Sequence, residues 1–270
     1  MPLEAISPIE KMLYRQAKVS RPVDKVSVVM AGYRENEIDI ACKSITQQTI
    51  IQKFPGMFEF IFVGLDTYPE DTTIKTASKY ADTVYTIGKR GKLTAMNYGI
   101  SRANNSLIAT VDADTYYLPH YMAAILRPFN QRGKPNRSIA ATAGFSFEYS
   151  IPYVPGPIAT LNAMYNHSVK NINRVAGRNG VFWKDYFIKA GRYNENINQL
   201  NTIEMQNEEE IGLGNRLRKF GRIIHVANAS NVHLGGTKVF CRNAYHNPDY
   251  FAGDLKRLEC ATMGMGTERF

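Results

Sequence analysis

Two carboxylates, Asp112 and Asp114, follow directly on the apolar run of residues 107–111. The run predicts a buried strand, and side chains at positions i and i+2 of an extended chain point the same way, so both acids can reach one cation. Mg²⁺ and Mn²⁺ are commonly held by one or two carboxylates, with phosphate oxygens and water completing the shell. The pattern therefore predicts a metal-bound phosphate at the carboxyl end of a strand. A polar turn is the alternative, since Asp-x-Asp alone is a weak motif.

The composition is that of a globular protein that can bury a large core. The chain has 270 residues, of which 44% are hydrophobic and 21% charged, enough for one large domain or two fused halves. Apolar stretches stay well short of the roughly 20 residues that a membrane span needs. Charged residues interrupt the first 18 positions, where a signal peptide would need an apolar core. We expect neither a transmembrane segment nor an export signal.

The cysteine content indicates the redox environment of the protein, and the net charge indicates the kind of partner it favours. Cys42, Cys241 and Cys260 are too few and too scattered for a zinc site, and their odd number argues against a disulfide framework. This favours a reducing, cytoplasmic setting. A net charge of +9 favours anionic partners, such as a nucleoside diphosphate, a lipid headgroup surface or nucleic acid. Charge alone does not choose among them.

Strands and helices are predicted to alternate over the first half of the chain. The predicted strands are residues 26–30, 58–63, 84–87 and 107–111, and the predicted helices are residues 36–48, 72–80 and 92–103. This rhythm is typical of right-handed βαβ crossovers and a mainly parallel sheet. The second half is less regular. It predicts one strand or a strand pair over 139–149, a helix over 213–221, a strand over 222–226, and loops at 131–137 and 151–157.

An ordered series of motifs resembles the family 2 glycosyltransferases of the GT-A fold. The segment 91–100, Gly-Lys-Leu-Thr-Ala-Met-Asn-Tyr-Gly-Ile, leads into Val-Asp-Ala-Asp at 111–114. Tyr33-Arg34-Glu35 resembles the family's aromatic-Asn-Glu turn, with Arg34 at the usual Asn position. The resemblance extends over roughly residues 25–245, about the length of a whole domain. Its later pieces are residues 180–184, 191–195, 209–221 and 232–236.

The resemblance implies an α/β fold in which different parts of the chain bind the donor and the acceptor. The fold would be a single GT-A-type domain, with a mostly parallel Rossmann-like sheet flanked by helices and a smaller antiparallel part on the acceptor side. Residues 25–115 would bind the nucleotide-sugar, and residues 116–235 would bind the acceptor and carry the catalytic base. An N-terminal arm at 1–24 and a C-terminal tail at 236–270 would flank them. The implied reaction is an inverting transfer of a sugar from a nucleoside-diphosphate sugar to an acceptor hydroxyl.

On the donor side, the resemblance assigns Asp114 to the divalent ion, with Asp112 nearer the ribose or sharing the metal through water. A bound Mn²⁺ or Mg²⁺ would stabilise the negative charge that develops on the leaving diphosphate. Lys92 is either a second contact to the donor phosphates or a solvated lysine at a helix start. Tyr33 and Glu35 are expected on the donor side as well.

Further residues each have two interpretations. Asp66 follows the second predicted strand, where the family places an Asp that hydrogen-bonds the nucleotide base, whereas Asp71 is expected to cap the next helix. His233 is a candidate ligand of the metal or contact of the diphosphate, or else a hydrogen-bonded residue at a strand end. Trp183 and Tyr193 either stack on sugar faces or pack in the core.

An inverting enzyme needs a carboxylate that accepts the proton of the attacking hydroxyl, opposite the departing diphosphate. A helical advance of about 100° per residue puts Glu209 and Glu210 on either side of the apolar stripe of the predicted helix, and turns Glu208 away. Spacing alone leaves both candidates. The family motif aligns Glu210 with the usual catalytic Asp, which makes Glu210 the expected base and Glu209 a positioning residue. The alternative is that these acids only begin a helix, where they favour its dipole.

Three other functions are alternatives. A nucleotidyltransferase would show a glycine-rich, basic loop after its first strand, but residues 31–35 read Ala-Gly-Tyr-Arg-Glu. A nucleic-acid-binding protein would gather Lys and Arg on one face with interleaved aromatics, whereas here they are scattered apart from residues 89–92 and 216–219. A catalytically inactive scaffold is the third, because Arg34 and Glu210 depart from the family's residues.

The absence of a Gln-x-x-Arg-Trp motif after the base, which processive synthases of the family carry, favours a single transfer per encounter. The acceptor could be a saccharide, a protein or a lipid-linked molecule. Positive charge attracts anionic headgroups, so residues 240–251 are a candidate patch for peripheral membrane contact. An ordinary packed C-terminal tail is the favoured alternative.

Overall fold

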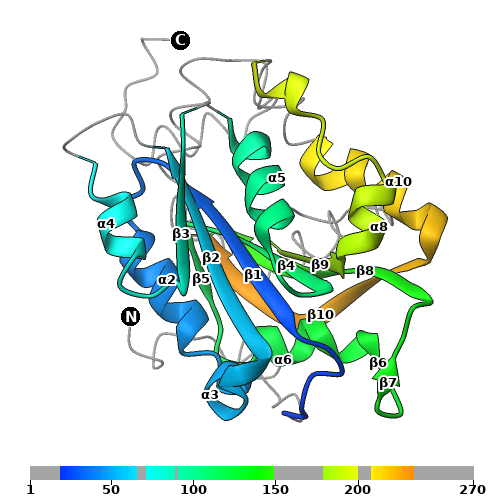
Figure 1. Cartoon of the computed structure of the whole chain (residues 1–270). Coiled ribbons are helices and arrows are strands. Elements are labelled where there is room, and N and C mark those ends of the chain that lie inside the picture. The colour runs from blue at the N-terminus through cyan, green and yellow to red at the C-terminus, as the bar shows by residue number, and fades with distance from the viewer. Residues whose placement is uncertain (1–18, 66–70, 89–90, 149–178, 200–207, 234–270) are drawn as a thin grey trace, which may run out of the picture.

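The computed structural model describes residues 19–65, 71–88, 91–148, 179–199 and 208–233. Their main element is an eight-stranded sheet in the order β3-β2-β1-β4-β9-β8-β10-β5, flanked by helices (Figure 1). The sheet strands are β1 Val26–Gly32, β2 Phe58–Leu65, β3 Thr83–Ile87, β4 Leu107–Asp112, β5 Thr115–Tyr117, β8 Ile139–Glu148, β9 Asn179–Trp183 and β10 Arg222–His233. The α-helices are α2 Ile38–Thr46, α3 Thr49–Lys53, α4 Thr73–Ala77, α5 Lys92–Arg102, α6 Tyr121–Leu126, α8 Lys184–Lys189 and α10 Leu213–Leu217.

The strand pairing confirms the predicted, mostly parallel α/β sheet. Strands β3, β2, β1 and β4 are parallel to one another, and β8 is parallel to β10. The antiparallel strands are β9, between β4 and β8, and β5, at the edge beside β10. The chain leaves β1 to form β2 and β3 on one side and returns to form β4 on the other. The sheet edge at the carboxyl ends of β1 and β4 is therefore a topological switch point, the place where ligands of open α/β sheets bind.

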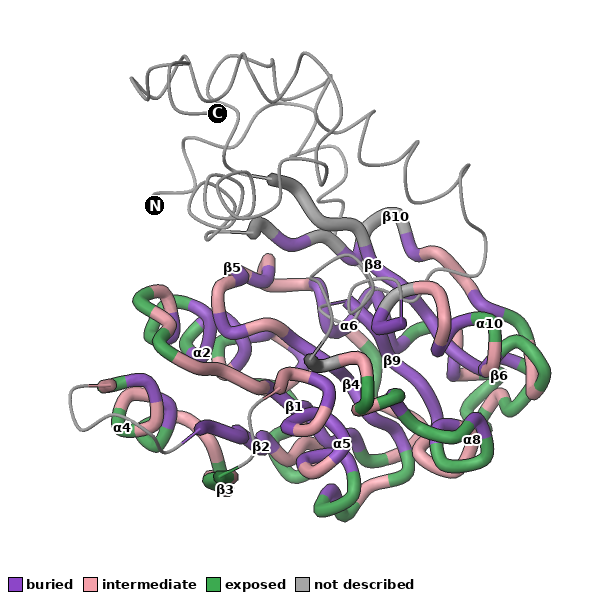
Figure 2. Tube along the Cα trace, turned by 90° about the horizontal axis from the view of Figure 1, so that it is seen from above, coloured by how far each residue is buried: buried purple, intermediate pink, exposed green. Residues whose placement is uncertain are grey.

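Burial on both faces explains why the central strands are almost uninterrupted apolar runs. In β1, Val28 and Met30 pack with α2 and α6 on one face of the sheet, whereas Val29 packs with α5 on the other. The buried segments follow the middle of the sheet, and exposed residues lie mainly on the outer helices and turns (Figure 2). The helices packed on both faces of the sheet thereby hold the neighbouring ends of β1 and β4 in fixed positions.

All seven elements predicted in the first half are present, with ends shifted by a few residues. The predicted strand over 139–149 is one long strand, and the strand predicted over 222–226 continues to His233. The helix predicted over 213–221 is α10 followed by a 3₁₀ turn at Arg218–Phe220. The predicted loop at 131–137 instead holds a small hairpin of β6 Asn130–Gln131 and β7 Lys134–Pro135. Its two turn residues have positive φ angles, as type I′ hairpin turns require.

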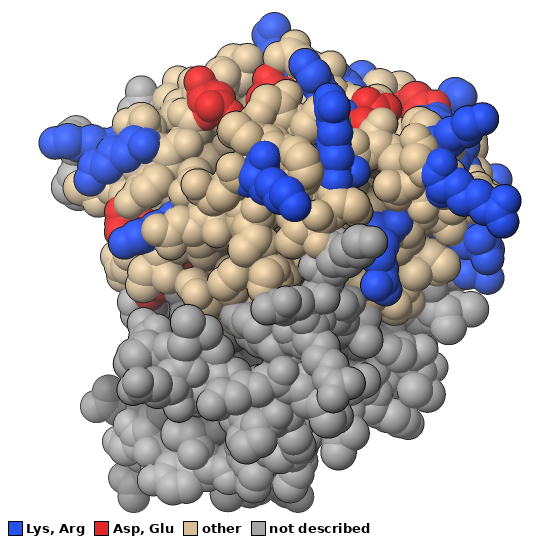
Figure 3. All heavy atoms as spheres, turned by 90° about the horizontal axis from the view of Figure 1, so that it is seen from below, with Lys and Arg blue, Asp and Glu red and all other residues tan. Residues whose placement is uncertain are grey.

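Several predictions fall on residues outside the described ranges. They are the arm before residue 19, the loop at 151–157, and the C-terminal tail with its candidate membrane patch. Among the helices that the structure describes, none combines the length and the apolarity that crossing a bilayer demands. Figure 3 shows Lys and Arg side chains at separate places on one face, with Asp and Glu among them. This spread agrees with the scattered basic residues of the sequence.

Candidate active site

The switch point brings together the segments 33–35 and 112–114, which contain candidate site residues predicted from the sequence. Asp112 ends β4 opposite Ala31 of β1, so the residues that follow the two strands start from the same edge of the sheet. The fit is tight, because a Cβ atom at Gly32 would lie only 3.0 Å from the Cβ of Ala113. Glu35 follows β1 at this same edge, and the charges of Asp114 and Asp112 both act on its carboxyl.

Burial, followed by the negative charges of Asp114, Asp112 and Glu37, raises the pKa of Glu35 from 4.5 to about 7, while Lys92 opposes the rise. Burial disfavours an ionised carboxyl, and neighbouring like charges add to this effect. The three carboxyls thus form a site with excess negative charge, where a cation would be stabilised. Within the described residues, however, no group of three or more His, Cys, Asp or Glu side chains is already arranged to hold a metal ion.

The turn after β1 is held in place by the residues that begin α4. The backbone N–H of Glu35 donates to Thr73 Oγ1 (2.9 Å), and that of Arg34 donates to Asp71 Oδ2 (3.2 Å). Asp71 also accepts from the N–H of Thr73, the first residue of α4, as the capping interpretation predicted. Arg34 has a φ of 54°, and its guanidinium lies 5.5 Å from the centre of the Tyr33 ring. Asn occupies this backbone region more readily than Arg.

Lys92 links Asp112, at the end of β4, to the turn that carries Glu209 and Glu210. Gly91, with a φ of 130°, precedes it, and Lys92 begins α5. Its Nζ lies 2.8 Å from Asp112 Oδ1 and 2.9 Å from Glu209 Oε1. Burial would lower the pKa of Lys92, but Asp112 and Glu209 together raise it above its ordinary value. The interpretation of Lys92 as a merely solvated lysine is therefore wrong, since two carboxylates bind it.

The turn before α10 differs from the predicted helix. Residues Glu208–Gly212 form a π-helical turn, and α10 begins only at Leu213. A π-helix is wider than an α-helix, with i→i+5 hydrogen bonds, so the spacing of 100° per residue does not apply there. The expectation that Glu208 turns away is wrong, because Glu208 and Glu209 are both buried, with exposed fractions of 8% and 4%. Glu210 lies in the same turn, but its side chain is outside the described part of the structure.

Tyr117 is a site residue that the sequence reasoning missed. Its hydroxyl accepts a hydrogen bond of 2.7 Å from the backbone N–H of Asp112. Burial, followed by the charge of Asp112, holds the pKa of Tyr117 well above its ordinary value, so the hydroxyl stays protonated. In the sequence, its only signal was its place at the end of the short strand β5, which directly follows Asp114.

The predicted histidine motif begins beside the acidic segment 112–114. At the end of β10, His233 pairs with Thr115 of β5, the residue that follows Asp114. The backbone of His233 is thus adjacent to the acidic segment, while its side chain, like the whole of Asp66, lies outside the described residues.

The two aromatic residues considered for sugar stacking are core residues instead. Trp183 is 1% exposed, donates from Nε1 to the carbonyl of Ile139 (2.9 Å), and packs edge-on against Phe129. Tyr193 is 3% exposed and packs edge-on against Phe187. The packing alternative is confirmed for both.

Comparison with known proteins agrees with this geometry. The family model "Glycosyl transferase family 2" matches residues 27–171, more than half of the chain. A search of curated protein sequences finds no significant match. Among solved structures, the mannosyltransferase PcManGT from Pyrobaculum calidifontis, in complex with GDP-Man and Mn²⁺, superposes with a TM-score of 0.59 at 14% identity, over 88% of this chain and 67% of that one.

A second similar structure is S. aureus TarS 1–349. It gives a TM-score of 0.54 at 14% identity over 80% of this chain and 62% of that one, and its complex with UDP gives 0.56 at 15% identity over 77% and 60%. The chain thus spans about three fifths of the TarS fragment, and these identities support the shared fold alone. Together with the match over more than half of the sequence, they show that the chain belongs to glycosyl transferase family 2.

Proposed function

We propose that this protein moves one sugar from a nucleoside-diphosphate sugar to an acceptor hydroxyl, with inversion at the anomeric carbon and with a divalent cation. The observation that carries the proposal is the Lys92 bridge. It holds Asp112, at the carboxyl end of β4, and Glu209, in the turn before α10, on either side of one ammonium group. A donor-side acid and an acceptor-side acid are thereby kept within reach of one substrate.

The residues at the switch point fit a hard divalent cation. Asp112 and Asp114 supply carboxylate oxygens, the ligands that Mg²⁺ and Mn²⁺ prefer. After burial, the charges of Asp114 and Asp112 also raise the pKa of Glu35, and a cation would relieve this repulsion among the three carboxyls. Asp114 is the proposed main ligand, since Asp112 Oδ1 already binds Lys92. His233 is a further candidate, because its backbone lies beside Thr115. When bound, the ion neutralises charge on the leaving diphosphate.

The chain's own residues provide the rest of the donor site. Tyr33 and Glu35 follow β1 at the same edge and are proposed to contact the nucleotide-sugar. Asp66 is proposed to hydrogen-bond the nucleotide base. Tyr117 fixes the backbone of Asp112, so the carboxyl of Asp112 keeps its direction. We therefore propose that residues 25–115 form the donor half and residues 116–235 the acceptor half, within one continuous sheet.

For the acceptor, Glu210 is the proposed general base and Glu209 the residue that positions it. The ion pair with Lys92 supports this order, because a carboxylate that already binds an ammonium is less free to accept a proton. In the reaction, the base takes the hydroxyl proton, the acceptor oxygen forms the new glycosidic bond, and the bond to the diphosphate oxygen breaks. Glu210 stands where the family has Asp, so its side chain is one methylene longer.

The test is a screen of UDP, GDP and dTDP sugars with and without Mn²⁺, read by thermal shift and by release of nucleoside diphosphate. A matching donor should raise the midpoint of unfolding by mass action, and Asp114→Asn should remove the Mn²⁺-dependent part. Binding without any transfer to saccharide, protein or lipid-linked acceptors would instead support the inactive scaffold. Absence of all nucleotide binding, with salt-dependent binding of nucleic acid, would overturn the proposal. A cytoplasmic setting stays a prediction from the cysteine content.

A further inference from the structure

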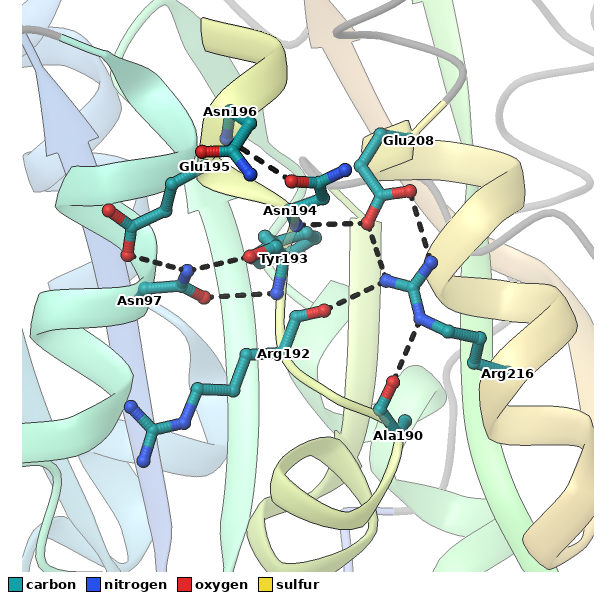
Figure 4. A network of polar contacts seen from close by, with 9 residues as sticks. All are labelled: Asn97, Ala190, Arg192, Tyr193, Asn194, Glu195, Asn196, Glu208 and Arg216. Carbon is teal, nitrogen blue, oxygen red and sulfur yellow. Dashed lines mark hydrogen bonds and ion pairs between the residues drawn. The ribbon is translucent and has the colours of Figure 1, made fainter.

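A network of polar contacts includes Glu208, the first residue of the π-helical turn and the neighbour of Glu209 in the sequence (Figure 4). It links three parts of the chain: the middle of α5, the segment from Ala190 to Glu195, and the turn with α10. The side chains of Asn97, Glu208 and Arg216 make its central contacts. None of these three residues was singled out as functional by the sequence.

Asn97 fixes the segment to α5. Its Nδ2 donates to the carbonyl of Tyr193 (2.9 Å), and its Oδ1 accepts from the N–H of Tyr193 (3.1 Å). The same Nδ2 lies 2.9 Å from Glu195 Oε1, and Thr94 Oγ1 donates to the other oxygen of Glu195. Asn97 is 6% exposed, so water competes little for these bonds. The helix that begins with Lys92 therefore also determines where residue 193 lies.

Arg216 fixes the other side of the segment. Its Nε donates to the carbonyl of Ala190, and one terminal nitrogen donates to the carbonyl of Arg192, both at 2.8 Å. The guanidinium also forms a two-pronged ion pair with Glu208, with one bond of 3.0 Å from Nη1 to Oε2. A planar guanidinium suits such a set of acceptors, whereas the single ammonium of lysine does not.

Both carboxylate oxygens of Glu208 accept hydrogen bonds within this network. Besides Arg216, it accepts from the backbone N–H of Asn194 at 3.1 Å. The backbone is shaped for it, because a Cβ atom at Gly212 would overlap the Glu208 carboxylate. A Cβ atom at residue 212 would therefore push the Glu208 carboxylate, the end of a flexible side chain, away from its contact with Arg216.

Resting on the proposed function, we propose that Asn97, Glu208 and Arg216 are positioning residues that hold the turn 208–212 at a fixed distance from α5. Glu208 immediately precedes Glu209, and Lys92 begins the helix that contains Asn97. The network therefore sets whether Glu209 stays within 2.9 Å of Lys92, and with it the place of the base opposite the donor. None of the three side chains needs to touch substrate.

The experiment compares Glu208→Gln, Arg216→Met, Arg216→Lys and Gly212→Ala with the wild type in full-length protein. The readouts are kcat, KM for the acceptor, the Kd of the nucleoside diphosphate with Mn²⁺, and hydrogen exchange. We expect kcat to fall about 10- to 100-fold, as misplacement of a catalytic group does, while the Kd changes less than about threefold. Arg216→Lys should recover only part of kcat. Asp185→Asn, which removes an exposed ion pair with Arg137, is the control and should behave as wild type.

The outcomes separate this inference from the proposed function. If the wild type transfers sugar and folded Glu208→Gln keeps its kcat, the positioning role is overturned and the function stands. If the wild type transfers nothing, the proposed function fails. Hydrogen exchange then tests the positioning network by itself. Faster exchange at both 92–97 and 208–212 in Glu208→Gln would support the coupling, and unchanged exchange would overturn it. Gly212→Ala, which keeps every charge, covers the case in which Glu208→Gln does not fold.

Discussion

Lys92 Nζ lies 2.9 Å from Glu209 Oε1, which joins the first residue of α5 to a turn that lies 117 positions later in the sequence. Lys92→Met would leave Glu209 and Asp112, both largely buried, without their counter-charge. Breaking a buried ion pair on one side is strongly destabilising, so we expect a loss of about 2–4 kcal/mol of unfolding free energy. Urea denaturation measures it. Lys43→Met on the exposed side of α2 is the control, and an equal, small effect of both changes would contradict the bridge.

Close packing of α5 on the sheet gives a second prediction. A Cβ atom at Gly99 would lie 2.7 Å from Val29 Cγ1 and 2.9 Å from Val63 Cγ2. Gly99→Ala should therefore destabilise by about 1–3 kcal/mol through overpacking, although alanine favours a helix by roughly 1 kcal/mol. Gly88→Ala, where nothing lies within 4 Å, should change stability little. Thermal unfolding of the two variants compares them directly, and a stabilised Gly99→Ala would show that the helix does not approach the sheet this closely.

The sequence could predict the acidic edge of the site because its cause is local. An apolar run that ends in Asp112 determines both the strand and the side on which the acid emerges. Parallel strands place their carboxyl ends together, which explains why Glu35 lies near Asp114, although Glu35 was placed on the donor side only through the family resemblance. The same reasoning explains why His233, at the end of a later strand, comes back beside Thr115.

The contacts made across the fold could not be predicted in this way. The bond from Lys92 to Glu209 depends on where α5 and the turn before α10 lie after folding, and no spacing along the chain encodes it. The direction of the Glu208 side chain was predicted wrongly because residues 208–212 form a π-helical turn, which changes the direction of its side chains and has no signature in the spacing of apolar residues. Trp183 illustrates the reverse case, since its large ring suits both a sugar and a core, and only packing decides.

The buried position of Trp183 predicts its fluorescence. It is the only tryptophan of the chain, it is 1% exposed, and its Nε1 donates to a backbone carbonyl. We expect a blue-shifted emission maximum and weak quenching by acrylamide. A nucleotide-sugar should leave both unchanged, because the ring cannot reach a ligand without leaving the core. Emission at the wavelength of exposed tryptophan, or strong quenching upon addition of acrylamide, would be incompatible with this packing.

The turn after β1 carries a strained residue. Arg34 has a φ of 54°, a region that costs L-residues about 1–2 kcal/mol and that Asn adopts more easily. Arg34→Asn should therefore stabilise the protein by roughly 0.5–1 kcal/mol. Arg34→Val, with a β-branched side chain, should destabilise it. Chemical denaturation compares both variants with the wild type, and an Arg34→Asn variant that is less stable than the wild type would mean that the contact of Arg34 with Tyr33 outweighs the backbone strain.

The raised pKa of Glu35 predicts how stability depends on pH. Because burial and the charges of Asp114 and Asp112 raise this pKa from 4.5 to about 7, the folded state holds a proton that the unfolded chain releases between these values. The contribution of Glu35 to stability is therefore fully present below pH 4.5 and is lost as the pH rises to about 7. Glu35→Gln should flatten this part of the profile and stabilise the protein above pH 7 by roughly 1–3 kcal/mol, at 1.36 kcal/mol per pKa unit. Unfolding measured in EDTA from pH 4.5 to 8 isolates the effect as the difference between the two proteins, and parallel profiles would show that the folded state does not perturb Glu35.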